Sequence, residues 1–220
     1  VQEMMSDSRY NEDDIIAVIE HLGKEGGKKY SENMLGEAIN YYPEESKGKW
    51  SPVRIFKDKE VILIGSGPGV FAHKKAIESY IINSKPLVMA LNAQTVIEND
   101  LIDFRIACHP VRLITDYERL TQLSQPLIIP ASIIPENILE SFSSIELLDY
   151  GMGIKDTKHV YGDTNCILSN PLVISYALAV VSSGKASRIL LAGFDGYSAD
   201  DPRRLENDVI FEKHQCVTSA

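Results

Sequence analysis

The stretch that decides the fold is Val61-Ile62-Leu63-Ile64-Gly65-Ser66-Gly67-Pro68-Gly69, a short apolar run that leads directly into a glycine-rich turn. An apolar run without polar alternation is typical of a strand buried on both faces, as in a parallel sheet. A helical pattern begins near Val70, so the turn joins a strand to a helix. Glycine lets such a turn approach a phosphate closely, and the free N–H groups of the following helix attract an anion. The stretch therefore predicts the first strand–helix unit of a nucleotide-binding fold.

Short apolar runs continue to alternate with helical segments along the chain from Glu60. The predicted strands are Val61 to Ile64, Leu87 to Leu91, Phe104 to Cys108, Leu127 to Ile129, Ile145 to Leu148 and Arg188 to Ala192. The predicted helices lie near residues 70–83, 115–123, 135–142 and 171–183. We therefore expect an α/β, Rossmann-like, doubly wound domain with a mainly parallel sheet over residues 60–220. In such sheets ligands bind outside the carboxyl ends of the strands.

The chain before this domain has a different pattern. Residues 1–42 are helical in pattern, with Asn11 and Ser31 as candidate N-caps of two helices. Residues 43–59 are rich in Glu, Lys, Ser and Pro, which favours a linker on the surface. Because the chain does not begin with Met, we expect it to be a piece of a longer protein, with residues 1–42 as the tail of a preceding domain.

Composition excludes several kinds of partner. The 220 residues carry 22 Lys and Arg against 31 Asp and Glu, a formal charge of −9, which argues against nucleic-acid binding or a basic membrane-surface patch. No apolar run approaches the roughly 20 residues that span a bilayer, and the first residues do not form a signal peptide. The sequence predicts a cytoplasmic chain without a membrane span. The cysteines Cys108, Cys166 and Cys216 have neither disulfide-framework nor metal-knuckle spacing.

The glycine-rich turn is the first candidate ligand site. Gly65, Ser66, Gly67, Pro68 and Gly69 are candidate phosphate-binding residues, and the alternative is a tight turn without a ligand. No Gly-Lys-Ser/Thr follows, so the turn is not a Walker A motif, and it is not a complete GxGxxG either. The second strand ends in an asparagine where an NAD-binding fold places an acid, which disfavours NAD.

Polar residues follow the other predicted strands. Asn92 can contact a base or ribose edge, or cap the following segment. His109 can act as a base, bind phosphate or simply bond to the strand end. Ser169 and Asn170 precede a proline and an apolar helix, where they can cap the helix and contribute an anion site. Asp195 can bind a sugar hydroxyl, orient a base or close an Asx-turn.

The chain after Tyr197 turns polar and is expected to form a mobile lid. His214 lies in this lid and is a candidate catalytic base. No Cys and His cluster has metal-ligand spacing, so the sequence predicts no metal site. Asp195, Asp200 and Asp201 could together hold a divalent ion such as Mg²⁺, but charge runs on loops are usually just solvated, so Mg²⁺ is not indicated.

Several of these motifs together resemble the bacterial sialyltransferase and motility-accessory-factor glycosyltransferase-like superfamily. The similarity spans about residues 60–197 and includes the glycine turn, Leu91-Asn92, Phe104 to Pro110, Ser169-Asn170 through Gly184, and Ile189 to Asp195. Gly69 departs from the serine that the family often has, and His109 stands where relatives of the motility factors usually have Asp.

The resemblance implies a Rossmann-type nucleotide-sugar site, typically for CMP-linked nonulosonic acids, with inverting transfer that requires no metal. It also implies a catalytic His in the region after the Gly-x-Asp strand, where His214 is the candidate. The superfamily includes a pterin diphosphokinase type as well, so the fold does not fix the reaction.

The first residues resemble a different family. Gln2-Glu3-Met4-Met5 and the helix that follows are similar to the end of the catalytic barrel of HMG-CoA-lyase-like aldolases, a group that includes 4-hydroxy-2-oxovalerate aldolase. This resemblance implies a fusion whose absent barrel makes or cleaves a 2-oxo acid.

The expected function is thus a nucleotide-sugar-binding, glycosyltransferase-like domain linked to an aldolase, in surface-sugar metabolism. The alternative is a noncatalytic nucleotide or metabolite-binding module, with lyase activity confined to the absent barrel. Whether this chain is itself an enzyme stays open, and a homo-oligomer is compatible with the sequence.

Overall fold

The structure is a computed structural model that describes residues 43–196, except 94, 110–112, 114–115, 135–138, 141 and 156–158. The described residues belong to one compact unit. The predicted helices within residues 1–42, the predicted lid and His214 lie outside the described residues, as does most of the helix predicted at 135–142.

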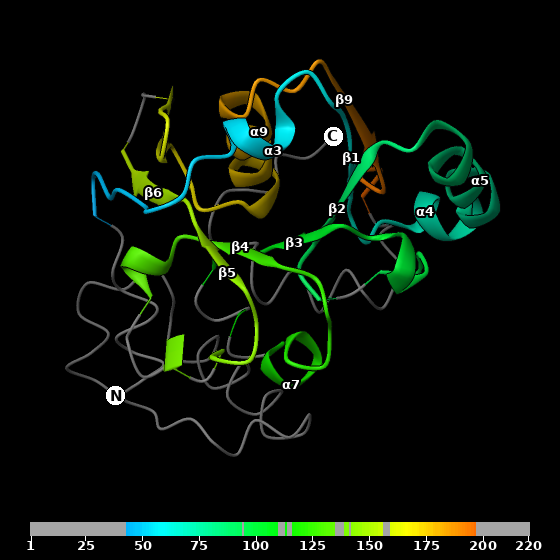
Figure 1. Cartoon of the computed structure of the whole chain (residues 1–220), viewed down its shortest axis with the longest axis horizontal. Helices are drawn as coiled ribbons and strands as arrows, with labels where there is room; N and C mark the ends of the chain where they lie inside the picture. Colours follow the sequence, from blue (N-terminus) through cyan, green and yellow to red (C-terminus); the bar gives the residue numbers. More distant parts are fainter. Residues whose placement is uncertain are drawn as a thin grey trace. The chain divides into compact units, whose positions relative to one another are not determined.

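Six strands form the main sheet, in the order β5-β4-β3-β2-β1-β9, and every neighbouring pair is parallel (Figure 1). The strands are β1 (Glu60–Ile64), β2 (Leu87–Leu91), β3 (Phe104–Ile106), β4 (Leu127–Ile129), β5 (Leu147–Asp149) and β9 (Arg188–Ala192). The predicted α/β class with a parallel, Rossmann-like sheet is therefore confirmed. Apart from Arg105 in β3, the buried residues of the inner strands are apolar because both faces of the sheet are covered.

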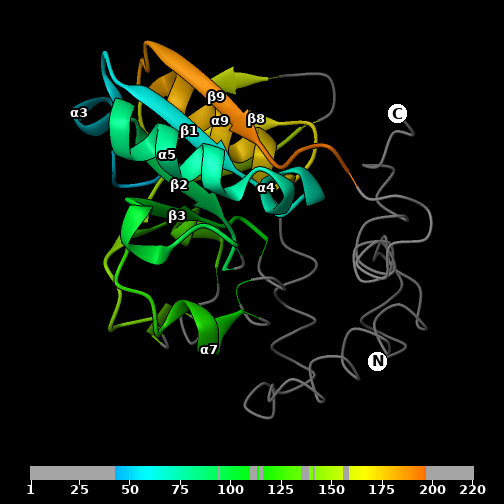
Figure 2. The same ribbon diagram turned by 90° about the vertical axis from the view of Figure 1, so that its right-hand side faces the viewer.

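Helices cover both faces of this sheet (Figure 2). On one face, α4 (Pro68–Ala72) and α5 (Lys74–Ser84) pack Val70 and Ile81 against Ile62 and Ile64 of β1. On the other face lies α9 (Val173–Ser183), which buries the apolar residues Tyr176, Ala177, Ala179, Val180 and Val181. The sequence predicts a single helix near residues 70–83, and the structure divides it at His73, whose φ of −111° and ψ of 16° depart from helical values.

Strand order reverses beside β1. Strands β1 to β5 follow one another to one side, whereas β9 returns to the opposite side of β1. Ile64 at the end of β1 pairs with Ala192 at the end of β9, so the turns after these two strands leave the sheet side by side. Such a switch point forms the ligand crevice in open α/β sheets.

A second, three-stranded sheet was not predicted from the sequence. It consists of β6 (Gly151–Ile154), β8 (Asn165–Leu168) and β7 (Val160–Tyr161), in the order β6-β8-β7. The Tyr150 hydroxyl lies 2.9 Å from Gly162 O and 2.8 Å from Asn165 O, and the Tyr176 hydroxyl of α9 donates to Tyr150 O. These tyrosines join the second sheet to α9. Shorter helices complete the described unit: α3 (Val53–Phe56), α7 (Tyr117–Leu120), η2 (Asn99–Leu101) and η3 (Ala131–Ile133).

Residues 43–59, expected to be a surface linker, contribute to this unit. Phe56 at the end of α3 is 0% exposed and packs edge-on against Trp50 and Phe104, with ring centroids 6.3 and 5.5 Å apart. Gly48 lies so close to the backbone of Asp149 that a Cβ there would overlap it. Because the segment is polar in composition, the sequence alone does not reveal that Phe56 and Gly48 pack against the rest of the unit.

None of the described helices is both long and apolar enough to cross a membrane.

Replacing Phe56 by Ala should lower the free energy of unfolding by about 3–5 kcal/mol, because the substitution leaves a cavity beside Trp50 and Phe104. Urea unfolding of the full chain measures this. The matched control is Phe71→Ala on α4, where the ring is 72% exposed, and there the change should stay within about 0.5 kcal/mol. Equal effects at both positions would contradict the packing described for residues 43–59.

Candidate functional site at the carboxyl edge of the sheet

The turns after β1 and β9 are in backbone contact. Gly65 N donates to Ala192 O at 2.8 Å, and Gly67 N donates to Gly193 O at 3.0 Å. A Cβ on Gly67 would lie 2.7 Å from Gly193 O, and one on Gly193 would overlap the Val70 side chain. Gly193 also has a φ of 79°, in the left-handed region that favours glycine. The close packing of the two turns is thus sufficient to explain why glycine occupies these positions, and the explanation requires no ligand.

The Asp195 carboxylate, which follows β9, is in contact with the turn that follows β1. Its Oδ2 accepts a hydrogen bond from Gly69 N at 2.7 Å, and its Oδ1 is 2.7 Å from where a Cβ of Gly67 would lie. Asp195 is nevertheless exposed. Two candidate residues 126 positions apart in the sequence are therefore hydrogen-bonded at the switch point.

The amides of the glycine turn are largely engaged within the protein. Those of Gly65, Gly67 and Gly69 donate to acceptors in the β9 turn, Val70 N donates to Gly67 O at 3.1 Å, and Pro68 has no N–H. Ser66 is exposed at the tip of the turn. The turn consequently presents a carboxylate to a ligand, and an ionised carboxylate accepts hydrogen bonds from hydroxyl groups but repels phosphate.

Asn92 lies one strand away, at the end of β2. Its φ of 58° is in the left-handed region, which asparagine tolerates better than most residues. Asn92 N donates to Ile106 O at 2.8 Å, and Asn92 O accepts from Arg105 Nη1 at 3.1 Å. The backbone of Asn92 is thus held on both sides, while the residue stays half-buried.

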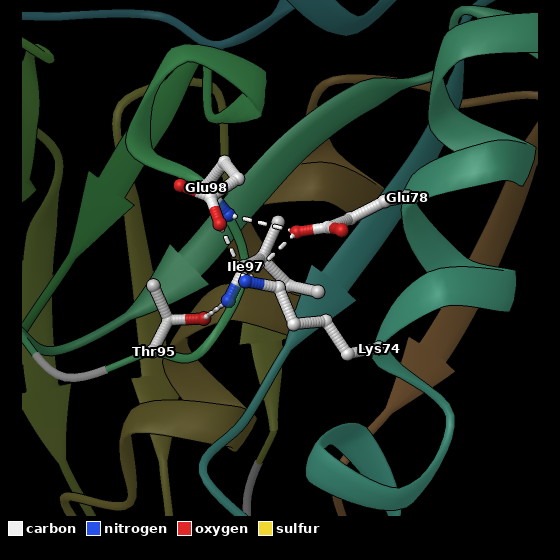
Figure 3. A network of polar contacts seen from close by, with 5 residues as sticks. All are labelled: Lys74, Glu78, Thr95, Ile97 and Glu98. Carbon is white, nitrogen blue, oxygen red and sulfur yellow. Dashed lines mark hydrogen bonds and ion pairs between the residues drawn. The ribbon is translucent and has the colours of Figure 1, made fainter.

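The loop after Asn92 is fastened to α5 by charged side chains (Figure 3). Lys74 Nζ lies 2.5 Å from Glu98 Oε1 and 3.5 Å from Glu78 Oε1, and Glu98 N donates to Glu78 Oε1 at 3.1 Å. The hydrogen bond to Glu98 raises the pKa of Lys74. Inside the loop, Ile97 N donates to Thr95 Oγ1 at 3.2 Å.

His109 follows β3 and is only 6% exposed. The residue before it, Cys108, is fully buried, and its Sγ donates to Pro171 O at 3.3 Å. Burial raises the pKa of the Cys108 thiol, so the reactive thiolate does not form at neutral pH. The end of β3 is thereby joined to the segment that leads into α9, and His109 is largely enclosed.

Ser169 and Asn170 lie in that segment and do not cap α9. The N-cap of α9 is Leu172, so the prediction of a cap at Ser169 or Asn170 with proline at the first helical position is wrong. Ser169 Oγ lies instead 3.2 Å from His159 Nε2. His159 is exposed, and sequence reasoning missed it because it precedes a strand of only two residues, which leaves no apolar pattern.

The site therefore has a compact part and a more distant part. Asp195 and the glycine turn are in contact, and Asn92 follows the neighbouring strand, about 4.8 Å further along the sheet. His109 lies beyond, after β3, and Ser169 directly follows β8. Among the described residues no three His, Cys, Asp or Glu side chains gather into a metal-binding group.

No protein-family model matches the chain, and no curated protein matches it either. Its class is assigned from the sheet: an α/β protein with a Rossmann-like parallel sheet and polar groups at the switch point.

Gly193→Ala and Gly196→Ala form a matched pair that tests the contact between the turns. Both glycines have positive φ, so each substitution should cost about 1–2 kcal/mol of stability from backbone strain. Gly193→Ala should cost about 1–3 kcal/mol more, because its Cβ meets Val70 and the Gly65 backbone whereas that of Gly196 meets nothing within 4 Å. Thermal unfolding measures the difference, and equal costs would mean that the turns are not packed as described.

Proposed function

We propose that this chain carries a nucleotide-sugar-binding, glycosyltransferase-like domain linked to an aldolase-like domain, acting in the cytoplasm in surface-sugar metabolism. One observation carries the binding part of the proposal. An exposed carboxylate, that of Asp195, is hydrogen-bonded to Gly69 N at the point where strand order reverses.

A carboxylate in this position favours a ligand rich in hydroxyl groups. Its two oxygens can accept about four hydrogen bonds, so Asp195 can keep Gly69 N and still accept from two sugar hydroxyls. Asn92, one strand away, can both donate and accept through its carboxamide. A ribose between these side chains places its base along β2, with the phosphate near the exposed Ser66 at the tip of the glycine turn.

The resemblance to bacterial sialyltransferases supports a CMP-linked nonulosonic acid as the donor. In the transfer, a base takes the proton of the acceptor hydroxyl, and the acceptor oxygen bonds to the anomeric carbon. The bond between that carbon and the phosphate oxygen breaks, and CMP leaves with the electron pair. His214 is the favoured base over His109, because His109 is largely enclosed.

The second candidate is a noncatalytic module that binds a nucleotide or metabolite. Its support is that the amides of the glycine turn already have acceptors within the protein, so a leaving phosphate finds few of them to stabilise its charge. Such a module binds its ligand without turnover.

Cytidine nucleotides should stabilise the chain in a thermal-shift screen of CMP, CDP, UDP, GDP and a CMP-linked sugar, with and without Mg²⁺. A ligand at about 100 times its Kd adds about 2.7 kcal/mol. Asp195→Ala and Asn92→Ala should each reduce the shift and together abolish it, whereas Asp163→Ala, at an exposed aspartate in the turn between β7 and β8, should retain it. Unchanged affinity in both site variants contradicts the site, and tighter binding by Asp195→Ala would mean that the carboxylate occupies the phosphate position.

Release of CMP from the CMP-linked sugar, followed by chromatography, separates the two candidates. A transferase should release CMP at a rate that falls in His214→Ala. Binding without release of CMP favours the noncatalytic module.

A further inference from the structure

An arginine occupies the middle of a buried strand. Arg105 is the central residue of β3, between β2 and β4, and is 1% exposed. Burial lowers the pKa of Arg105 to about 10, although the charge of Asp116 opposes the shift. Its Nε is buried without a hydrogen-bond partner among the described residues. An apolar side chain at such a position usually stabilises a sheet as well or better, so this guanidinium requires a reason other than packing.

The hydrogen bonds that the structure describes for the Arg105 guanidinium go to residues 92, 93 and 99, which follow β2. Nη1 donates to Asn92 O at 3.1 Å and to Ala93 O at 2.8 Å, and Nη2 donates to Asn99 Oδ1 at 2.7 Å. One planar group thereby holds both ends of residues 92–99. Gln125 reinforces the far end, because its Nε2 donates to Asn99 O at 2.8 Å.

These contacts determine the direction of the Asn92 side chain. The N–H of Asn92 is held by Ile106 O, and its carbonyl is held by Arg105. Fixing both groups fixes φ and ψ, and φ and ψ fix the direction of the Cα–Cβ bond. The ion pair between Lys74 and the exposed Glu98 holds the same loop from outside, but ion pairs at the surface contribute little.

We propose that Arg105 is a positioning residue that orients the Asn92 carboxamide toward the ribose or base of the nucleotide. The inference rests on the proposed function and extends it. Arg105 does not touch the ligand. It sets the affinity and base preference of the site through Asn92, and its hydrogen bonds to Asn92 O, Ala93 O and Asn99 Oδ1 offset part of the energetic cost of its burial.

Arg105→Met and Asn92→Ala, singly and combined, test the proposal by titration calorimetry with CMP. In the wild-type background Arg105→Met should weaken CMP binding about tenfold, because an Asn92 carboxamide that is no longer held in place loses a hydrogen bond to the ligand. In the Asn92→Ala background it should change affinity by less than about twofold, because residues that act through one group are not additive. An equal loss in both backgrounds, or no loss in either, overturns the proposal.

Amide hydrogen exchange of the ligand-free chain gives a second readout. Arg105→Met should raise the exchange rate of the Asn92 amide about tenfold or more, while that of Ala90 inside β2 stays unchanged. Unchanged exchange at Asn92 overturns the positioning role even if no nucleotide binds. Failure of wild-type protein to bind CMP is a different result, since it rejects the proposed function.

Two milder variants keep the test usable if Arg105→Met does not fold. Arg105→Lys keeps the charge but not the planar set of donors, so it should restore stability without restoring CMP affinity. Asn99→Ala removes one acceptor at the far end of the loop and should weaken CMP binding less than Arg105→Met does. Full recovery of affinity in Arg105→Lys contradicts the geometric role of the guanidinium.

Discussion

The contact between the two glycine turns is the constraint on which the rest of the structure depends. Where β9 pairs with β1 up to its last residue, Gly193 O lies within hydrogen-bonding distance of Gly67 N, and a Cβ at either position would overlap neighbouring atoms. The same approach places Asp195 beside Gly69. Packing of the sheet and assembly of the site are therefore consequences of one backbone contact.

Because of this contact, the glycine-rich turn presents different chemical groups from those of a phosphate-binding turn. In a phosphate-binding turn the backbone N–H groups point outward and are available to bind an anion. Here their acceptors belong to the neighbouring turn, and the group left facing the crevice is negative. Under the proposed function, selection among ligands depends on hydroxyl groups and on the Asn92 carboxamide, and the carbonyl of Asn92 is held by the buried Arg105.

The sequence predicts the main sheet well because its strands are apolar runs bounded by turns, and β2 and β4 fall on the predicted residues. The second sheet escapes prediction, since Gly151 and Gly153 interrupt the pattern of β6 and β7 has only two residues. Contacts between distant residues, such as Asp195 with Gly69, also carry no local signal. The rule that ligands bind at the carboxyl ends of parallel strands identifies the candidate positions. It cannot show that His109 is enclosed or that Leu172 occupies the N-cap position of α9.

The order of strands has a consequence for how the molecule folds. Strands β1 to β5 each pair with the next strand in the sequence, so most of the sheet can grow by short, local steps. β9 must return to β1 from far along the chain: Arg188 and Glu60, which are hydrogen-bonded, are 128 residues apart. Closing so long a loop is the step with the highest entropic cost. Because that step also joins the two glycine turns, a nascent chain lacks its complete candidate site until the edge strand β9 has docked.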